Sequence, residues 1–170
     1  MIADANDIGQ GAMMPSYEPW DPERALTVIA PLRSIEGALL PMLHALQEAF
    51  GYIPGDAVPL LAETLNLSRA EVHGVVTFYH DFRVEPPGRR VLKLCRAEAC
   101  QAAGGVPLAD QAERRLAIRF GETTADQKVT LDAVYCLGLC AVAPSAMLDD
   151  RLVGRLDATR LDALLVEAQT

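Results

Sequence analysis

The four cysteines of the chain restrict its fold more than any other feature, because they occur as two close pairs. Four residues separate Cys95 from Cys100, and three separate Cys136 from Cys140. All four lie in the second half of the chain, and each has a partner nearby in sequence. A fold in which they act together must therefore bring two cysteine-bearing loops to one place.

The segments that precede the pairs predict how this happens. Residues 90–95 form a short β-type run, and residues 128–136 alternate in the manner of a strand. Each pair thus begins where a predicted strand ends. Two neighbouring loops at one end of a sheet can bring four thiolates together, which is the arrangement of a metal site.

The spacing within the pairs favours one kind of metal centre over another. A tetrahedral zinc site with four cysteine ligands often has two residues between the cysteines of a pair. A [2Fe-2S] cluster takes two thiolates per iron, and a longer loop can wrap around its bridging sulfides. Gly138 fits a cluster because the backbone must approach closely. We rank a [2Fe-2S] cluster first and zinc second; two structural disulfides and a thioredoxin-type dithiol remain as lesser alternatives.

Composition excludes several other classes of function. The chain has 15 Lys and Arg against 23 Asp and Glu, a net charge of −8, which opposes binding to nucleic acid. No apolar run approaches the roughly 20 residues that a membrane span needs. The first twenty residues do not resemble a secretory signal, so we expect a cytoplasmic protein with cysteines that are free, metal-bound or catalytic.

The first half of the chain is predicted to be a small helical bundle over residues 21–85, after a flexible tail at residues 1–20. Asp21 followed by Pro22 is a helix start, and Ser68 with Glu71 forms a capping box. Four helices are expected, at residues 21–32, 37–50, 56–66 and 68–82.

A second domain, residues 86–170, is predicted to follow the break at Pro86-Pro87-Gly88. Besides the two strands before the cysteines, we expect a largely helical segment at residues 99–120 and further strand at residues 147–156. A final helix is expected after Asp157. This order indicates a sheet covered by helices, so the whole chain has an α+β fold.

Two further features have an ordinary and a functional interpretation. His73 and His80 are seven residues apart on the predicted fourth helix, and we favour two unremarkable histidines over a metal-binding pair. Residues 77–82 carry three aromatic side chains. These indicate either core packing or an interface with a partner.

Several motifs in order along the chain resemble one known family. They are Gly51–Pro54, Val75–Tyr79, the two cysteine pairs, Thr123–Asp126 and Ala143-Pro144. The sequence is similar to the thioredoxin-like [2Fe-2S] subunit family, which includes the 24 kDa subunit of respiratory complex I. One position departs from the family pattern, because Gln127 stands where glycine usually follows the aspartate.

The resemblance implies a thioredoxin-like second domain with Cys95, Cys100, Cys136 and Cys140 as ligands of one [2Fe-2S] cluster. Residues 68–74 and 95–100 are most similar to the gamma subunits of soluble, NAD-dependent formate dehydrogenases. That match implies a flavoprotein partner with FMN and NAD, and a catalytic subunit with a molybdenum cofactor. The chain itself is then an electron carrier without catalytic residues of its own. The corresponding subunit of complex I or of an NAD-linked hydrogenase is the main alternative, and a zinc-binding interaction module is a distant one.

Overall fold

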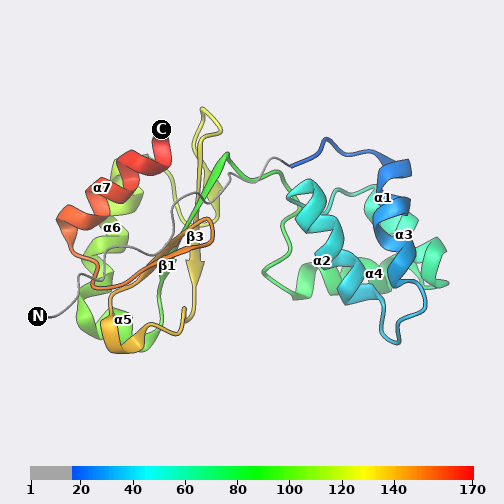
Figure 1. The fold of residues 1–170 in the computed structure, drawn as a ribbon, viewed down its shortest axis with the longest axis horizontal. Coiled ribbons are helices and arrows are strands. Elements are labelled where there is room, and N and C mark those ends of the chain that lie inside the picture. The colour runs from blue at the N-terminus through cyan, green and yellow to red at the C-terminus, as the bar shows by residue number, and fades with distance from the viewer. Residues whose placement is uncertain (1–16) are drawn as a thin grey trace, which may run out of the picture. The chain divides into compact units, whose positions relative to one another are not determined.

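The computed structural model describes residues 17–170, which form two compact units, one ending at Pro87 and the other beginning at Gly88 (Figure 1). The tail expected at residues 1–20 lies outside the described residues except for its last four. This short stretch contacts the helical unit. The Glu18 N–H donates to the Ala49 carbonyl at 3.0 Å, and the Trp20 ring meets the Phe50 ring edge-on with centroids 5.0 Å apart.

The first unit consists of helices that begin at local capping signals. The Asp21 carboxylate accepts the Glu23 N–H at 2.9 Å, and Ser68 and Glu71 form the reciprocal bonds of a capping box. Its helices are α1 (Pro22–Ile29) continued by a 3₁₀ turn (Ala30–Leu32), α2 (Leu39–Phe50), α3 (Ala57–Leu65) and α4 (Arg69–Phe78).

A continuous apolar core holds these helices together. On α2 the buried residues Leu43, Leu46 and Phe50 recur at intervals of three and four, so they share one face of the helix. The other helices supply the rest of this core, including Ile29, Leu61, Val72 and Val76.

Helix α4 ends at Phe78, four residues before the predicted end at Phe82. Tyr79 is extended, with φ −91° and ψ 107°, and the backbone that follows is held by Gln47 of α2. The Gln47 side-chain N–H donates to the Asp81 carbonyl at 2.7 Å, and its carbonyl oxygen accepts the Arg83 N–H at 2.7 Å. A contact over more than thirty positions overrides the local helical pattern here.

The second unit is built on a five-stranded mixed sheet in the order β2-β3-β1-β4-β5. Central strand β1 (Arg90–Cys95) runs parallel to β3 (Val129–Val134) and antiparallel to β4 (Ala146–Leu148). The short strands β2 (Glu122–Thr123) and β5 (Arg151–Val153) complete the two edges, each antiparallel to its neighbour.

The long helices of this unit, α6 (Val106–Leu116) and α7 (Ala158–Gln169), pack against each other on one face of the sheet (Figure 1). Their apolar residues meet Leu92 and Leu94 of β1 and Leu131 of β3. From the helices come Leu108, Ala112, Leu116, Leu161, Leu164 and Leu165. This core shares no residue with the core of the helical unit.

The segment over residues 99–120, predicted to be largely helical, is divided into shorter elements. A short helix α5 (Glu98–Cys100) passes into a π-helical turn (Gln101–Gly105), where Gly104 has a φ of 95°, before α6 begins. Helix α6 then stops at Leu116 because Ala117 adopts a left-handed conformation with φ 56°. No helix among residues 17–170 is long and apolar enough to span a bilayer.

Candidate metal centre

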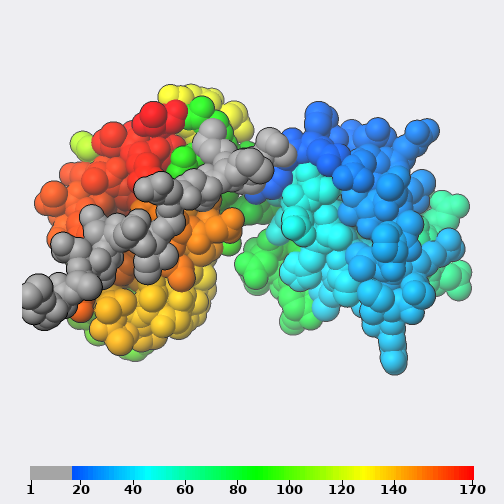
Figure 2. All heavy atoms as spheres, in the orientation of Figure 1, coloured from blue at the N-terminus to red at the C-terminus, as the bar shows by residue number. Residues whose placement is uncertain are grey.

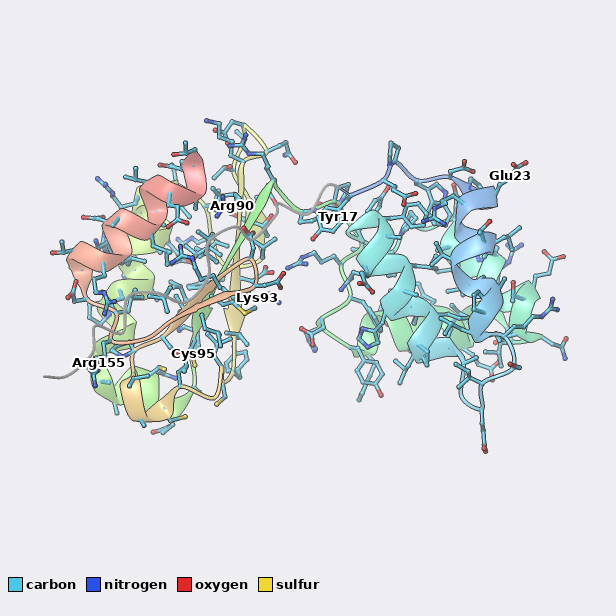
Figure 3. All side chains as sticks on the ribbon, viewed as in Figure 1. Tyr17, Glu23, Arg90, Lys93, Cys95 and Arg155 are labelled. Atoms are coloured by element: carbon cyan, nitrogen blue, oxygen red, sulfur yellow. The ribbon has the colours of Figure 1, made fainter. Side chains whose placement is uncertain are left out.

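The two cysteine pairs lie at the same edge of the sheet, as the predicted strands require. Cys95 is the last residue of β1, and its register partner is Val134, the last residue of β3. Because β1 and β3 are parallel, their carboxyl ends meet, and Cys136 follows β3 after a single residue. Figure 3 labels Cys95 at the end of β1.

The second pair is held by a tight loop. The sulfurs of Cys136 and Cys140 are 3.7 Å apart, and the Gly138 N–H donates to the Cys136 sulfur at 3.3 Å. Both cysteines are exposed. Cys136 and Gly138 have φ values of 125° and 76°. Cys136 thus adopts a positive φ, a backbone conformation that is usually found at glycine.

The first pair is buried at the base of the same edge. Cys95 ends β1, and Cys100 lies in α5. The Cys100 thiol is 3.4 Å from the hydroxyl of Ser145, the residue just before β4. The Ser145 carbonyl also accepts the Cys95 N–H at 3.0 Å, so three strands contribute to this edge of the sheet.

Hydrogen bonds to the Cys95 sulfur connect the two loops. Burial works to raise the pKa of the Cys95 thiol, but hydrogen bonds to its sulfur outweigh this and lower the pKa below its ordinary value. The donors are the backbone N–H groups of Ala97 and Leu137, the Cys100 thiol and the Ser145 hydroxyl. Leu137 lies between the cysteines of the second pair, so it links that loop to the first pair.

The pKa of Cys140 changes in the opposite direction. Its thiol donates a hydrogen bond to Cys136, and the negative charges of Cys136, Cys100 and Cys95 further raise the pKa of Cys140. Thiolates in these positions repel one another, so the site is suited to a cation that neutralises their charge.

The donor set of two cysteine pairs fits a two-iron cluster. Across residues 17–170, no three side chains of His, Cys, Asp or Glu converge closely enough to hold one metal ion. The sulfurs are instead arranged pair by pair, and a [2Fe-2S] cluster needs two thiolates on each of two irons. The N–H groups of Ala97, Leu137 and Gly138 already donate to cysteine sulfurs. All four cysteines are free, so the disulfide alternative is wrong for this structure.

His73 and His80 belong to the helical unit, and only His73 lies on α4. Because α4 ends at Phe78, His80 lies beyond the helix, and the expectation that His73 and His80 share one helical face is wrong. Both side chains are exposed.

Ser145 belongs to the site but was not predicted from the sequence. It is buried beside the sulfurs, but four residues separate it from Cys140 and its neighbours in sequence are the apolar Pro144 and Ala146. A polar residue at the start of an apolar strand is the only signal that marks it.

The surface around the exposed pair is open to a partner. The segment of residues 135–141, gold in Figure 2, lies at the surface of its unit. Tyr135, next to Cys136, is 77% exposed. A large exposed aromatic beside a redox-capable site is typical of a surface that another protein covers.

Comparison with known proteins supports this assignment. The sequence matches the model of the family described as thioredoxin-like [2Fe-2S] ferredoxin over residues 25–169. An NADH-quinone oxidoreductase subunit of Rhizobium meliloti (strain 1021) is 42% identical over 128 residues, covering 75% of this chain and 76% of the relative. NADP-reducing hydrogenase subunit HndA of Solidesulfovibrio fructosivorans is 31% identical over 132 residues, covering 78% and 77%.

A solved structure agrees with the sequence relatives. The crystal structure of an NAD+-reducing [NiFe]-hydrogenase in the air-oxidised state matches with a TM-score of 0.67 and 31% identity over 81% of this chain. This chain spans 23% of that longer hydrogenase chain. Together with the paired cysteines at one sheet edge, these matches establish that the chain belongs to the thioredoxin-like [2Fe-2S] ferredoxin family.

Proposed function

We propose that this chain is an electron-transfer subunit that holds one [2Fe-2S] cluster on Cys95, Cys100, Cys136 and Cys140. The observation that carries the proposal is the meeting of both cysteine pairs at one sheet edge, with the Leu137 N–H of one loop bonded to a sulfur of the other. When bound, such a cluster accepts and releases one electron at a time.

The chain's own groups have two tasks in this proposal. The N–H groups of Ala97, Leu137 and Gly138 stabilise negative charge on the ligand sulfurs by donating hydrogen bonds to them. Strand β1 and helix α5 exclude water from Cys95 and Cys100, whereas the loop around Cys136 stays accessible to a redox partner.

The proposed partner is a flavoprotein subunit that binds FMN and NAD. NAD accepts a hydride, which carries two electrons, whereas one [2Fe-2S] centre transfers electrons one at a time. A flavin must therefore convert between one-electron and two-electron transfer. The relatives named as NADH-quinone oxidoreductase and NADP-reducing hydrogenase subunits are consistent with a nicotinamide-linked complex.

More narrowly, we propose the gamma subunit of a soluble, NAD-dependent formate dehydrogenase in the cytoplasm. The support is the resemblance of residues 68–74 and 95–100 to that subunit. The complex would then include a catalytic subunit with a molybdenum cofactor, where formate is oxidised.

A second candidate is the equivalent subunit of complex I or of an NAD-linked hydrogenase. The specific observation in its favour is the identity of 42% to an NADH-quinone oxidoreductase subunit and of 31% to a hydrogenase subunit. The cluster, its proposed ligands and the flavoprotein are common to both candidates. They differ in the remaining subunits, which supply electrons in a formate dehydrogenase or hydrogenase and accept them in an NADH-quinone oxidoreductase.

One experiment tests both levels of the proposal. The tagged chain is purified without oxygen from its native host, and its iron, acid-labile sulfide, zinc and co-purifying subunits are measured. We expect two irons and two sulfides per chain, together with a flavoprotein and a molybdenum-containing subunit active on formate. Stoichiometric zinc without iron overturns the electron-transfer role. Iron with a hydrogenase subunit or quinone-reducing subunits instead of the molybdenum subunit establishes the second candidate.

A further inference from the structure

Ser145 places a buried hydroxyl group against the first cysteine pair. The residue is only 2% exposed, and its Oγ lies 3.4 Å from the sulfur of Cys100. Its backbone is fixed by the Cys95 N–H, which donates to the Ser145 carbonyl at 3.0 Å. The hydroxyl is thus held at the sulfurs by the pairing of β1 with the start of β4.

Within residues 17–170, the hydrogen-bond partner of this hydroxyl is the sulfur of Cys100. Most buried serine hydroxyls bond to oxygen or nitrogen atoms of the backbone, which are stronger partners than sulfur. The polar environment of Ser145 is therefore the ligand site itself.

Metal ligation decides the direction of the hydrogen bond. With free thiols, either the Cys100 sulfur or the Ser145 oxygen can be the donor. A cysteine that binds iron has lost its proton, so only the serine O–H can then donate. A hydrogen bond to a ligand sulfur withdraws negative charge from it, and this favours the form that carries the additional electron.

We propose that Ser145 donates its hydroxyl hydrogen to the Cys100 ligand sulfur and thereby raises the reduction potential of the centre. The inference rests on the ligand set of the proposed function and adds a residue that acts on the potential through a ligand. Ser145 is a positioning residue and touches no substrate.

Two substitutions separate this role from simple packing. Ser145→Ala removes the oxygen and keeps the Cβ, while Ser145→Thr keeps the hydroxyl and adds a methyl group. A matched control is Thr130→Val on β3. The Thr130 hydroxyl is also buried, but it bonds to the Gly88 N–H at 2.7 Å and to the Thr123 hydroxyl at 2.7 Å, not to sulfur.

The test uses the full chain carrying its centre, with iron and sulfide content checked first, and a spectroscopically monitored redox titration. We expect Ser145→Ala to shift the midpoint to a more negative potential, lowering the equilibrium constant for reduction roughly five-fold, the scale of one neutral hydrogen bond. Ser145→Thr should restore most of the potential, and Thr130→Val should leave it unchanged.

A second measurement remains decisive if Ser145→Thr does not fold. Exchange into deuterated water should shift the iron–sulfur stretching bands of the wild type in resonance Raman spectra, and Ser145→Ala should show a smaller shift. An unchanged potential and an unchanged isotope shift in a fully loaded Ser145→Ala protein overturn the inference. Absence of iron from the wild type, or a complete centre in Cys100→Ala, overturns the proposed ligand set instead.

Discussion

Cys95 and Val134 are register partners at the carboxyl ends of two parallel strands. Parallel strands end at the same edge of a sheet, so a cysteine that ends one strand lies beside the loop that leaves the other. The 41-residue interval between Cys95 and Cys136 in sequence thus becomes a short distance in space, and the Leu137 N–H bonds directly to the Cys95 sulfur.

Replacing any one of Cys95, Cys100, Cys136 and Cys140 by alanine should remove or destabilise the cluster. Each substitution leaves one iron with a single thiolate and admits water to the sulfide core. Visible absorbance and iron content measure the loss. His73→Ala and His80→Ala serve as controls that should retain full absorbance, and a complete cluster in any cysteine variant would show that the ligand set is wrong.

The reduction potential should lie well below zero. Four thiolates carry more negative charge than the mixed ligands of a Rieske centre, and the chain has a net charge of −8, which disfavours a further electron. A redox titration should give a midpoint on the order of −400 mV, as in plant-type ferredoxins. A positive midpoint would contradict all-cysteine ligation.

Gln127→Gly should stabilise the second unit. Gln127 adopts a φ of 57°, a left-handed conformation that costs an ordinary residue about 1–2 kcal/mol, whereas glycine adopts it without strain. Part of that gain is lost because glycine is more flexible in the unfolded chain, so we expect a net gain of about 0.5–1 kcal/mol.

Thermal unfolding followed by circular dichroism measures this gain. Gln127→Ala is the matched control because it removes the same side chain and keeps the strained conformation. Equal midpoints for the glycine and alanine variants would show that the backbone conformation at this turn carries no strain.

A shortened chain that begins at Gly88 should fold and bind the cluster but lose stable association with the flavoprotein. The buried core around Leu92 and Leu161 lies wholly within residues 88–170, and the four cysteines lie there too. Iron content and a pull-down with the flavoprotein test the two claims separately. Full partner binding by the shortened chain would remove the docking role from the helical unit, and loss of the cluster would show that the second unit depends on the first.

Phe78→Ala should weaken association with the flavoprotein by about tenfold, the effect of losing one well-buried aromatic at an interface. Phe78 is 72% exposed at the end of α4 and contacts the Tyr79 ring edge-on, so its aromatic surface is free to bury against a partner. The dissociation constant of the purified pair measures the effect. Leu26→Ala on α1, where the side chain is 49% exposed, is the control; equal weakening by both would indicate a general loss of stability.

Sequence reasoning succeeded where the signal is local. The bounds of strand β1 at Arg90–Cys95 and the capping box of Ser68 with Glu71 both follow from residues within a few positions of each other. The resemblance also singled out Gln127, and the structure explains the usual glycine there, because this turn requires a positive φ.

The remaining features depend on contacts between distant residues. Helix α4 stops early because Gln47 binds the backbone beyond it, and β2 has only two residues, too few to form a periodic pattern. Ser145 reaches the sulfurs only because β4 pairs with β1. Such contacts are properties of the folded chain and leave no local trace in the sequence.

The unequal exposure of the two cysteine pairs affects how oxygen can damage the protein. Under the proposed ligand set, oxygen and peroxide reach the centre from the side of Cys136 and Cys140, where exposed thiolates are the first groups to be oxidised. A partner that docks over this loop therefore shields the centre as well as exchanging electrons with it, and a protein made in excess over its partner is the form most vulnerable to oxidative damage.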